Sequence, residues 1–527
     1  MSSRRLAPSK ALGDTFEISY CLPNIKASYA DMNRREDNQQ DDSSAGSHDQ
    51  ATMEAEYAAA ALALPRSRFA LLKGWLRGTA GIDRAIGFTV LARFWSSLAG
   101  LVTVLLIAKF LTRAEQGYYY TFSSLVALQI VFELGFSFVI LQMASHERVH
   151  LNISLDQHVS GDIVAHRRLA SVIQKSVRWY SLASFLLLTV LLIAGAYFFS
   201  THDQQGAAVS WRIPWYADAI AATITFQLDP ILSFLEGCGF VANVARLRLI
   251  QAAVGSCLAW LALITHHGLF APAMMIIGTA STSAIWLFGK RRLLLGLLRF
   301  DPGPDRIHWW KEVWPFQWRI AISWLSGYFI YQLFNPVLFA YSGPVAAGQM
   351  GMSISLANAL QAVAISWLNT KAAPFGAMVA RRKYAELDRL FFRTLRQSIS
   401  VFLTGTLVIF CGLLYLNFRH MRFADRLLSP ALVLGLLLST AVNLVVFGEA
   451  LYLRTHKQER FLLNSVLGAV LVTPSTYFLG RYFGAPGMIL GNLAIALFVG
   501  LPYGTWVFLK YRKLWHQELP ISGDAAP

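Results

Sequence analysis

The chain has 527 residues, of which 55% are hydrophobic and only 14% are charged, and it carries a formal net charge of +16. This composition excludes a soluble globular protein and indicates an integral membrane protein. The four cysteines (Cys21, Cys238, Cys257 and Cys411) have neither the spacing of a disulfide framework nor that of a metal site.

The N-terminal stretch differs from the rest of the chain. The segment RREDNQQDDSSAGSHDQ at 34–50 is polar and contains no aromatic residue. Such segments bury too little apolar surface to offset the entropy lost on folding. We therefore expect residues 1–80 to form a disordered cytoplasmic tail.

Twelve long apolar runs follow the tail. A helix needs about 20 mostly apolar residues to cross a bilayer, and each run is that long. The runs are continuous rather than alternating, which favours helices over barrel strands. They cover 86–108, 117–142, 179–199, 213–236, 243–265, 268–289, 317–341, 345–368, 397–417, 427–452, 461–480 and 484–509.

Lysine and arginine are distributed unequally between alternate loops. From residue 66 onward, one set of loops holds 32 of these residues and the other set holds 7. Basic residues concentrate on the cytoplasmic side of membrane proteins. The bias predicts that both termini are cytoplasmic. It also predicts that the positive charge faces anionic membrane lipids and not a nucleic acid.

The sequence contains an internal repeat. Glu236 and Gly255 are 19 residues apart, as are Glu449 and Gly468, and both pairs span a cytoplasmic turn. We expect an all-α protein of two six-helix bundles at 85–290 and 317–512. A basic linker (291–316) joins them and a cytoplasmic tail (513–527) follows. Parallel repeats of this kind are typical of transporters with a cavity between the halves.

Charged side chains inside the runs point to function, because they are costly in lipid unless they face a cavity or a partner. Apart from Arg246, Arg248 and Arg319, which lie within a few residues of the ends of their runs, Arg93 is the one Lys or Arg within a run. At about 1.5 Å per residue, Arg93, Glu133 and Asp229 fall at a similar depth, roughly 10 to 13 Å from the cytoplasmic end. We expect Arg93 to pair with Glu133 and to exchange that partner for an anionic head group, since Arg can grip phosphate with two donors.

The acids at the ends of the runs have a simpler interpretation. Glu236 lies close to Arg246 and Arg248, and Glu449 lies close to Arg454 and Arg460. We expect ion pairs that close the cytoplasmic turns.

One motif suggests an alternative function. HERVH at 146–150 fits H-E-x-x-H, which holds zinc in metalloproteases when it lies on a helix. Here it begins where the second run leaves the membrane, and no third ligand is evident. We expect no metal site, and an intramembrane zinc protease is the less favoured hypothesis.

Two stretches carry a family resemblance. ARFWSSLAGLVTVLLIAKFLTRAEQGYYYTFSSLVALQIVFELGFS (92–137) and FQLDPILSFLEGCGFVANVARLRLIQ (226–251) resemble bacterial polysaccharide-export proteins. These form the polysaccharide transporter branch of the MOP (multidrug/oligosaccharidyl-lipid/polysaccharide) flippase superfamily. The branch includes the Wzx-type O-antigen flippases of lipopolysaccharide assembly.

The resemblance implies a flippase and no enzyme. Its substrate would be an undecaprenyl-diphosphate-linked oligosaccharide, moved from the cytoplasmic to the periplasmic leaflet of the bacterial inner membrane. It also implies a MATE-like V-shaped arrangement with alternating access, coupling to protons or sodium without a bound cofactor, and polysaccharide polymerases as partners. An ion-coupled multidrug or cation exporter of the same superfamily is the alternative.

The residues expected to bind substrate combine charges and aromatic rings, which suit a diphosphate and sugars respectively. The expected substrate-binding residues are Arg93, Glu133, Asp229, Arg319, Trp95 and Tyr328. Further aromatic residues on the helices expected to line the cavity are Tyr118, Tyr119, Tyr120, Trp324 and Tyr331.

Overall fold

The computed structural model describes residues 84–154, 156–202, 209–456 and 460–517. Over these residues the protein is an all-α membrane protein, with one two-stranded sheet outside the apolar runs. The predicted N-terminal tail lies outside the described residues.

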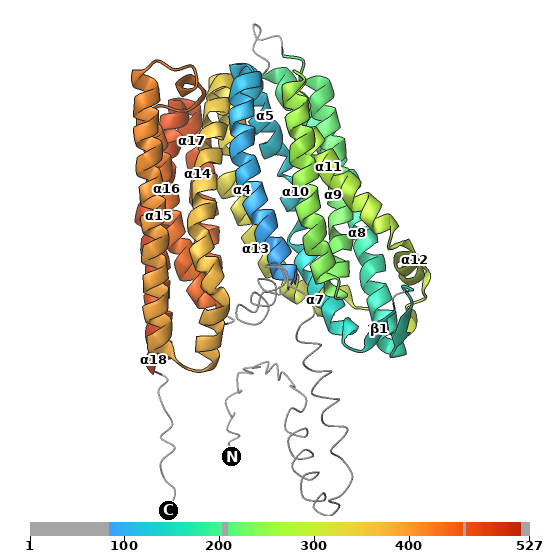
Figure 1. Cartoon of the computed structure of the whole chain (residues 1–527). Helices are drawn as coiled ribbons and strands as arrows, with labels where there is room; N and C mark the ends of the chain where they lie inside the picture. Colours follow the sequence, from blue (N-terminus) through green and yellow to red (C-terminus); the bar gives the residue numbers. More distant parts are fainter. Residues whose placement is uncertain (1–83, 155, 203–208, 457–459, 518–527) are drawn as a thin grey trace, which may run out of the picture. The chain divides into compact units, whose positions relative to one another are not determined.

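The first half of the chain folds into helices that follow the first six apolar runs (Figure 1). Its elements are α4 (Arg84–Phe110), α5 (Arg113–Val126), α6 (Gln129–Glu133), α7 (Phe136–Arg148), β1 (Leu151–Ile153), β2 (Val159–Gly161), α8 (Ile163–Thr201), α9 (Arg212–Gly237), α10 (Val241–Ile264), η1 (Gly268–Phe270) and α11 (Ala271–Phe288). The antiparallel strands β1 and β2 form a hairpin in the polar stretch between α7 and α8.

The second half follows a short connecting region. The connecting elements are α12 (Arg291–Arg299), η2 (Gly303–Asp305) and the π-helical turn η3 (Trp309–Val313). The second half comprises α13 (Trp314–Tyr331), α14 (Phe334–Ala380), α15 (Tyr384–Phe418), η4 (Ala424–Arg426), α16 (Pro430–Arg454), α17 (Leu462–Ile495), η5 (Ala496–Gly500) and α18 (Leu501–Gln517). Because α18 continues to Gln517, the second half extends beyond the predicted boundary at 512.

By length and composition, the described residues contain nine helices that can cross a membrane, or ten if the bent pair α5–α6 and α7 counts as one. Two of these candidates cover 61 and 54 residues, far more than the roughly 20 residues of one crossing. Each contains a glycine with non-helical backbone angles, Gly343 in α14 and Gly484 in α17. Counting each as two crossings brings the ten candidates to the twelve that the sequence predicts.

Contacts around Gly484 show that the chain reverses direction there. A Cβ atom added to Gly491 would lie 2.4 Å from the hydroxyl of Ser475, and one added to Gly487 would lie 2.7 Å from the carbonyl oxygen of Leu479. These pairs are separated by 16 and 8 residues, so the two parts of α17 pack as an antiparallel hairpin. A proline follows each of these glycines: Pro344 comes directly after Gly343, and Pro486 comes two residues after Gly484. Proline has no backbone N–H, so it cannot complete the helical hydrogen bonds across the turn.

The loops between the twelve crossings lie at two ends of the molecule. We call the end with more lysine and arginine the basic end and the other the opposite end. The basic end carries the β1–β2 hairpin, α12, the α14–α15 connection and the end of α18 (Figure 1). The opposite end carries the α4–α5 connection, Gly343, η4 and Gly484. These are the two sets of loops that the charge bias separates.

The connecting region is bound to α8 rather than extended between the halves. The side-chain amide of Gln174 donates to the carbonyl oxygens of Leu297, Leu298 and Phe300 at 2.7 to 3.3 Å. Arg167 pairs with Asp305 at 2.9 Å, and Leu293 and Leu297 are each 1% exposed. Residues 291–307 therefore pack as part of the first half, and the free part of the predicted linker is short.

Arg168 joins the end of this region to α7. Its guanidinium contacts Glu147 at 2.8 Å and Glu312 at 2.5 Å. Partial burial acts to raise the pKa of Glu312, but the backbone N–H of His308 and the charge of Arg168 hold that pKa below its ordinary value. The charged form of Glu312 is thus the one that the fold stabilises.

Candidate functional site

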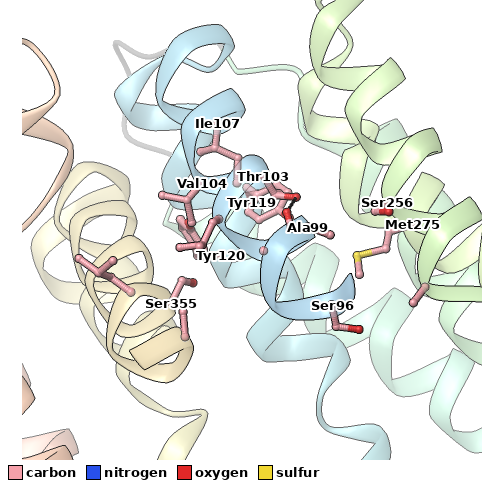
Figure 2. A pocket seen from close by; sticks show the side chains of 15 residues that line it. Ser96, Ala99, Thr103, Val104, Ile107, Tyr119, Tyr120, Ser256, Met275 and Ser355 are labelled. Carbon is pink, nitrogen blue, oxygen red and sulfur yellow. Dashed lines mark hydrogen bonds between the residues drawn. The ribbon is translucent and has the colours of Figure 1, made fainter. Parts of the chain in front are cut away.

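A pocket lies between α4, α5, α10, α11 and α14, and so between the two halves (Figure 2). Its volume is about 230 Å³. Its polar side chains are hydroxyls, contributed by Ser96, Thr103, Tyr119, Tyr120, Ser256 and Ser355. No Asp, Glu, His, Lys or Arg is among the described residues that line it.

The lining of α4 follows from helical spacing. Ser96, Gly100, Thr103 and Ile107 all line the pocket and recur every three or four residues, so they share one face of the helix. Arg93 lies on the same face, one turn nearer the basic end. Its side chain is exposed, and among the described residues no acid lies within ion-pair distance of it. An unneutralised guanidinium therefore stands next to an uncharged pocket.

The pocket is closed toward the opposite end by contact between the halves. A Cβ atom added to Gly117 of α5 would lie 1.9 Å from the carbonyl oxygen of Pro344, so the two backbones touch there. Gln116 is 1% exposed and donates to the carbonyl oxygens of Gly348 (2.8 Å) and Arg426 (3.0 Å). We call these contacts, together with the ion pair between Arg113 and Asp425, the opposite-end seam.

A second group of polar residues surrounds a break in the second crossing. Leu134 and Gly135 have positive φ angles (50° and 68°), and α7 is bent by 45° relative to the preceding helices. Non-helical backbone at membrane depth is tolerated where protein covers it. Here a Cβ atom added to Gly135 would lie 2.4 Å from Ile320 of α13.

Glu133 lies at this break. Its depth in the second run predicts Asp229 and Arg93 as neighbours, and the structure places only Asp229 near it. Its carboxylate hydrogen bonds to Ser137, whose hydroxyl lies 3.0 Å from that of Tyr180. It also interacts electrostatically with Asp229. The expected pair with Arg93 is not formed, since no acid among the described residues lies within ion-pair distance of that guanidinium.

Of the aromatic residues predicted to line a cavity, only two do so in this pocket, and Trp324 and Tyr331 are exposed outside it. Tyr119 and Tyr120 line the pocket. Trp95 supports it from behind by donating to Ser256 at 3.1 Å. Tyr118 and Tyr328 are buried at 1% and 5% exposure in the packed interior. The side chain of Arg319 lies outside the described residues.

The two repeat-related acids differ. Glu236 pairs with Arg248 at 2.8 Å, as the sequence predicts. Glu449 does not pair with Arg454 or Arg460. It is 4% exposed and accepts a hydrogen bond from Thr505 of α18 at 2.8 Å.

The arginines near these two turns lie elsewhere. Arg460 lies over the ring of Tyr511, 4.8 Å from its centroid. Arg246 is exposed on α10. The expected pairing at the second turn is therefore wrong, because α18 packs against α16 and covers the acid.

Asp218 lies within the fourth apolar run, and the sequence assigns it no role. Asp218 is 1% exposed, and neither of its carboxylate oxygens has a hydrogen-bond partner among the described residues. It interacts electrostatically with Tyr119, which lines the pocket.

The HERVH motif occupies the end of α7 and the turn beyond it. His146 has 83% of its side chain exposed, and the carboxylate of Glu147 is held by Arg168. Within the described part of the chain, no three His, Cys, Asp or Glu side chains are grouped so that they could hold a metal ion. Glu147 thus has a structural partner.

No protein-family profile and no curated protein matches the chain. Several solved structures have a similar fold. An inward-facing multidrug resistance MATE family transporter of the MOP superfamily is 14% identical, with a TM-score of 0.49, over 79% of this chain and 99% of that one. The lipid II flippase MurJ in an inward closed conformation is 14% identical, with a TM-score of 0.49, over 81% and 90%. A MOP superfamily transporter from Pyrococcus furiosus is 13% identical, with a TM-score of 0.44, over 82% and 95%.

Proposed function

We propose that this protein is a flippase that moves an undecaprenyl-diphosphate-linked oligosaccharide across the bacterial inner membrane. The observation that carries the proposal is Arg93, an exposed guanidinium without an acidic partner on the face of α4 that lines the pocket. A guanidinium binds phosphate oxygens through two parallel hydrogen bonds. The diphosphate would bind there, and the saccharide would occupy the uncharged pocket above.

The direction of transport follows from the proposed orientation. The basic end faces the cytoplasm, as the loop charges predict. The opposite-end seam closes the pocket toward the periplasm, so this conformation receives substrate from the cytoplasmic side. A second conformation, with the seam open, would release it to the periplasmic leaflet, where a polysaccharide polymerase could receive it.

The alternative, an ion-coupled exporter of cationic drugs, fits the pocket less well. A cation in a site of low dielectric requires a nearby carboxylate, and none lines this pocket. The acids lie outside it: Glu133 with Asp229 at the helix break, and Asp218 behind Tyr119. We propose that these acids bind the coupling proton or sodium ion.

Substitution of Arg93 tests the proposal. Arg93→Ala should abolish export of surface polysaccharide in a complementation assay, whereas Arg93→Lys should retain part of it because lysine lacks the two-donor geometry. Glu133→Gln should be milder than Arg93→Ala. Arg178→Ala, which removes an exposed arginine on α8, is the matched control and should export normally.

The amount of each variant in the membrane must be measured alongside export. Normal export by Arg93→Ala would refute a role for Arg93 in substrate binding. Loss of export explained entirely by loss of the protein from the membrane would refute it equally, because Arg93 would then be structural.

A further inference from the structure

Three hydroxyl groups of the pocket have already donated their protons to the backbone. Thr103 donates to Ala99 at 2.8 Å, Ser256 to Ala253 at 3.0 Å and Ser355 to Gly351 at 2.9 Å. A hydroxyl has one proton and two acceptor lone pairs. Each of these three groups can therefore offer a ligand only an acceptor.

Two tryptophans fix this arrangement. The indole N–H of Trp95 donates to Ser256 at 3.1 Å, and that of Trp260 donates to Thr103 at 2.9 Å. An indole can only donate, so these contacts occupy one lone pair of each hydroxyl and prevent it from turning its proton toward the pocket. One lone pair on each oxygen remains for a ligand.

The other hydroxyls of the wall belong to Ser96, Tyr119 and Tyr120, and the remaining side chains that line it are apolar. The rings of Tyr119 and Tyr120 stand at 82° to each other with centroids 5.1 Å apart. Tyr120 is 7% exposed, and its hydroxyl lies near that of Ser355 but makes no hydrogen bond of regular geometry among the described residues. This phenol can therefore donate to a ligand.

The volume limits what can enter. At about 30 Å³ for each water molecule in the liquid, about 230 Å³ corresponds to seven or eight waters. This is room for a single sugar ring.

We infer that this pocket binds one neutral sugar ring that carries O–H or N–H donors, and that it rejects an acidic sugar. The inference rests on the proposed function and names the class of saccharide next to the diphosphate. A neutral hydroxylated or N-acetylated ring supplies the donors that Thr103, Ser256 and Ser355 require. A carboxylate supplies acceptors only, and it would lose water without gaining a cation. The pocket thereby selects among glycans, whereas Arg93 recognises the diphosphate that all of them share.

The test compares three synthetic lipids on the purified full-length protein by native mass spectrometry. The probes are undecaprenyl diphosphate and the same lipid bearing N-acetylglucosamine or glucuronic acid. We expect the N-acetylglucosaminyl lipid to bind about tenfold more tightly than the bare lipid, as one or two well-formed hydrogen bonds allow. The glucuronyl lipid should bind no more tightly than the bare lipid.

Two variants locate the effect in the pocket. Ser355→Ala removes an acceptor, and Tyr120→Phe removes the buried donor while keeping the ring. Each should weaken binding of the N-acetylglucosaminyl lipid about two- to tenfold and leave binding of the bare lipid unchanged. Ser366→Ala, which removes a hydroxyl that bonds to the backbone of the same helix but is exposed outside the pocket, should change neither.

The outcomes separate the two proposals. If the bare lipid does not bind, or binds equally well to Arg93→Ala, the proposed function fails. If the bare lipid binds but both sugar lipids bind alike, the pocket does not select neutral sugars and this inference is overturned while the proposed function stands. Equal weakening of all three lipids by Tyr120→Phe would also overturn it.

Discussion

The two ends of the molecule are held together in different ways. At the opposite end, hydrogen bonds and an ion pair cross from one half to the other, as Gln116 with Gly348 and Arg113 with Asp425 demonstrate. At the basic end, apart from the pair between Arg168 and Glu312 just before α13, the ion pairs close within a half. Glu236 pairs with Arg248 in the first half, and Asp388 pairs with Arg512 in the second.

Under the proposed function, this difference separates contacts that must break during transport from contacts that need not. Alternating access requires the seam between the halves to open, while each cluster at the basic end can move with its own half as a rigid unit. We therefore expect substitutions in the seam to change which side of the pocket is accessible. Substitutions in the basic-end clusters should change stability instead.

The largest effect should come from fixing the seam covalently. Cysteines at positions 113 and 425, introduced into a cysteine-free background and joined by a short bismaleimide, should abolish export because the opposite end cannot open. The matched control is a pair at positions 167 and 305, whose native side chains form an ion pair within the first half. Continued export with the 113–425 pair fully cross-linked would show that the seam does not open during transport.

A smaller effect should come from loosening the seam. Gln116→Leu leaves two buried carbonyl oxygens without their donor, which costs about 1 to 3 kcal/mol in the closed state. That shift favours the open state by roughly five- to 150-fold. A cysteine at position 355, at the pocket wall, should then react faster with a membrane-impermeant maleimide added from the periplasmic side.

Opening of the seam, and not unfolding, must be the cause of that reactivity. The unfolding temperature of Gln116→Leu should stay close to that of the parent protein. A labelling rate equal to that of the parent would mean that Gln116 does not hold the closed state.

The smallest effect on transport should come from the basic end. Asp388 is 8% exposed and receives hydrogen bonds from Arg512 at 2.7 and 2.9 Å and from Tyr452 at 2.8 Å. Asp388→Asn leaves Arg512 without its charge partner. It should lower the free energy of unfolding by about 3 kcal/mol, measured by thermal unfolding in detergent micelles.

The same measurement on Glu236→Gln provides the contrast. Arg248 has 54% of its side chain exposed, so loss of that pair should cost at most about 0.5 kcal/mol. A larger loss of stability in Glu236→Gln than in Asp388→Asn would contradict the assignment of the buried cluster as the stabilising one.

Much of the fold was predictable because its signals are local. Apolar length and loop charge determine where helices cross and which loops share an end, and Gly343 and Gly484 separate runs that the sequence already shows as distinct. The docking of 291–307 onto α8 was not predictable, because it depends on Gln174 meeting carbonyl oxygens more than 120 residues away. The internal repeat predicted wrongly that Glu449 pairs with an arginine as Glu236 does. The repeat carries no information on which side chains α18 covers.

The depth of the charged residues was predictable from the sequence, but the residues that line the pocket were not. The depth of Arg93, Glu133 and Asp229 follows from their positions in the runs, and the structure brings Glu133 and Asp229 together. The side of α4 that Arg93 faces depends on how α4 packs against α10 and α14, which no local pattern encodes. The orientation of the hydroxyls of Thr103 and Ser256 depends on tryptophans in other positions of the chain.

The docked connecting region decides where the gene could be divided. A fragment ending at Lys290, just after the last helix of the first bundle, would lose Leu293, Leu297 and Ile307. These side chains belong to the connecting region that packs against α8, and they are only 1 to 2% exposed. A fragment ending near His308 would keep them. Two polypeptides divided at that later point, and produced together in one cell, are the pair from which we expect a correctly folded two-chain protein to assemble.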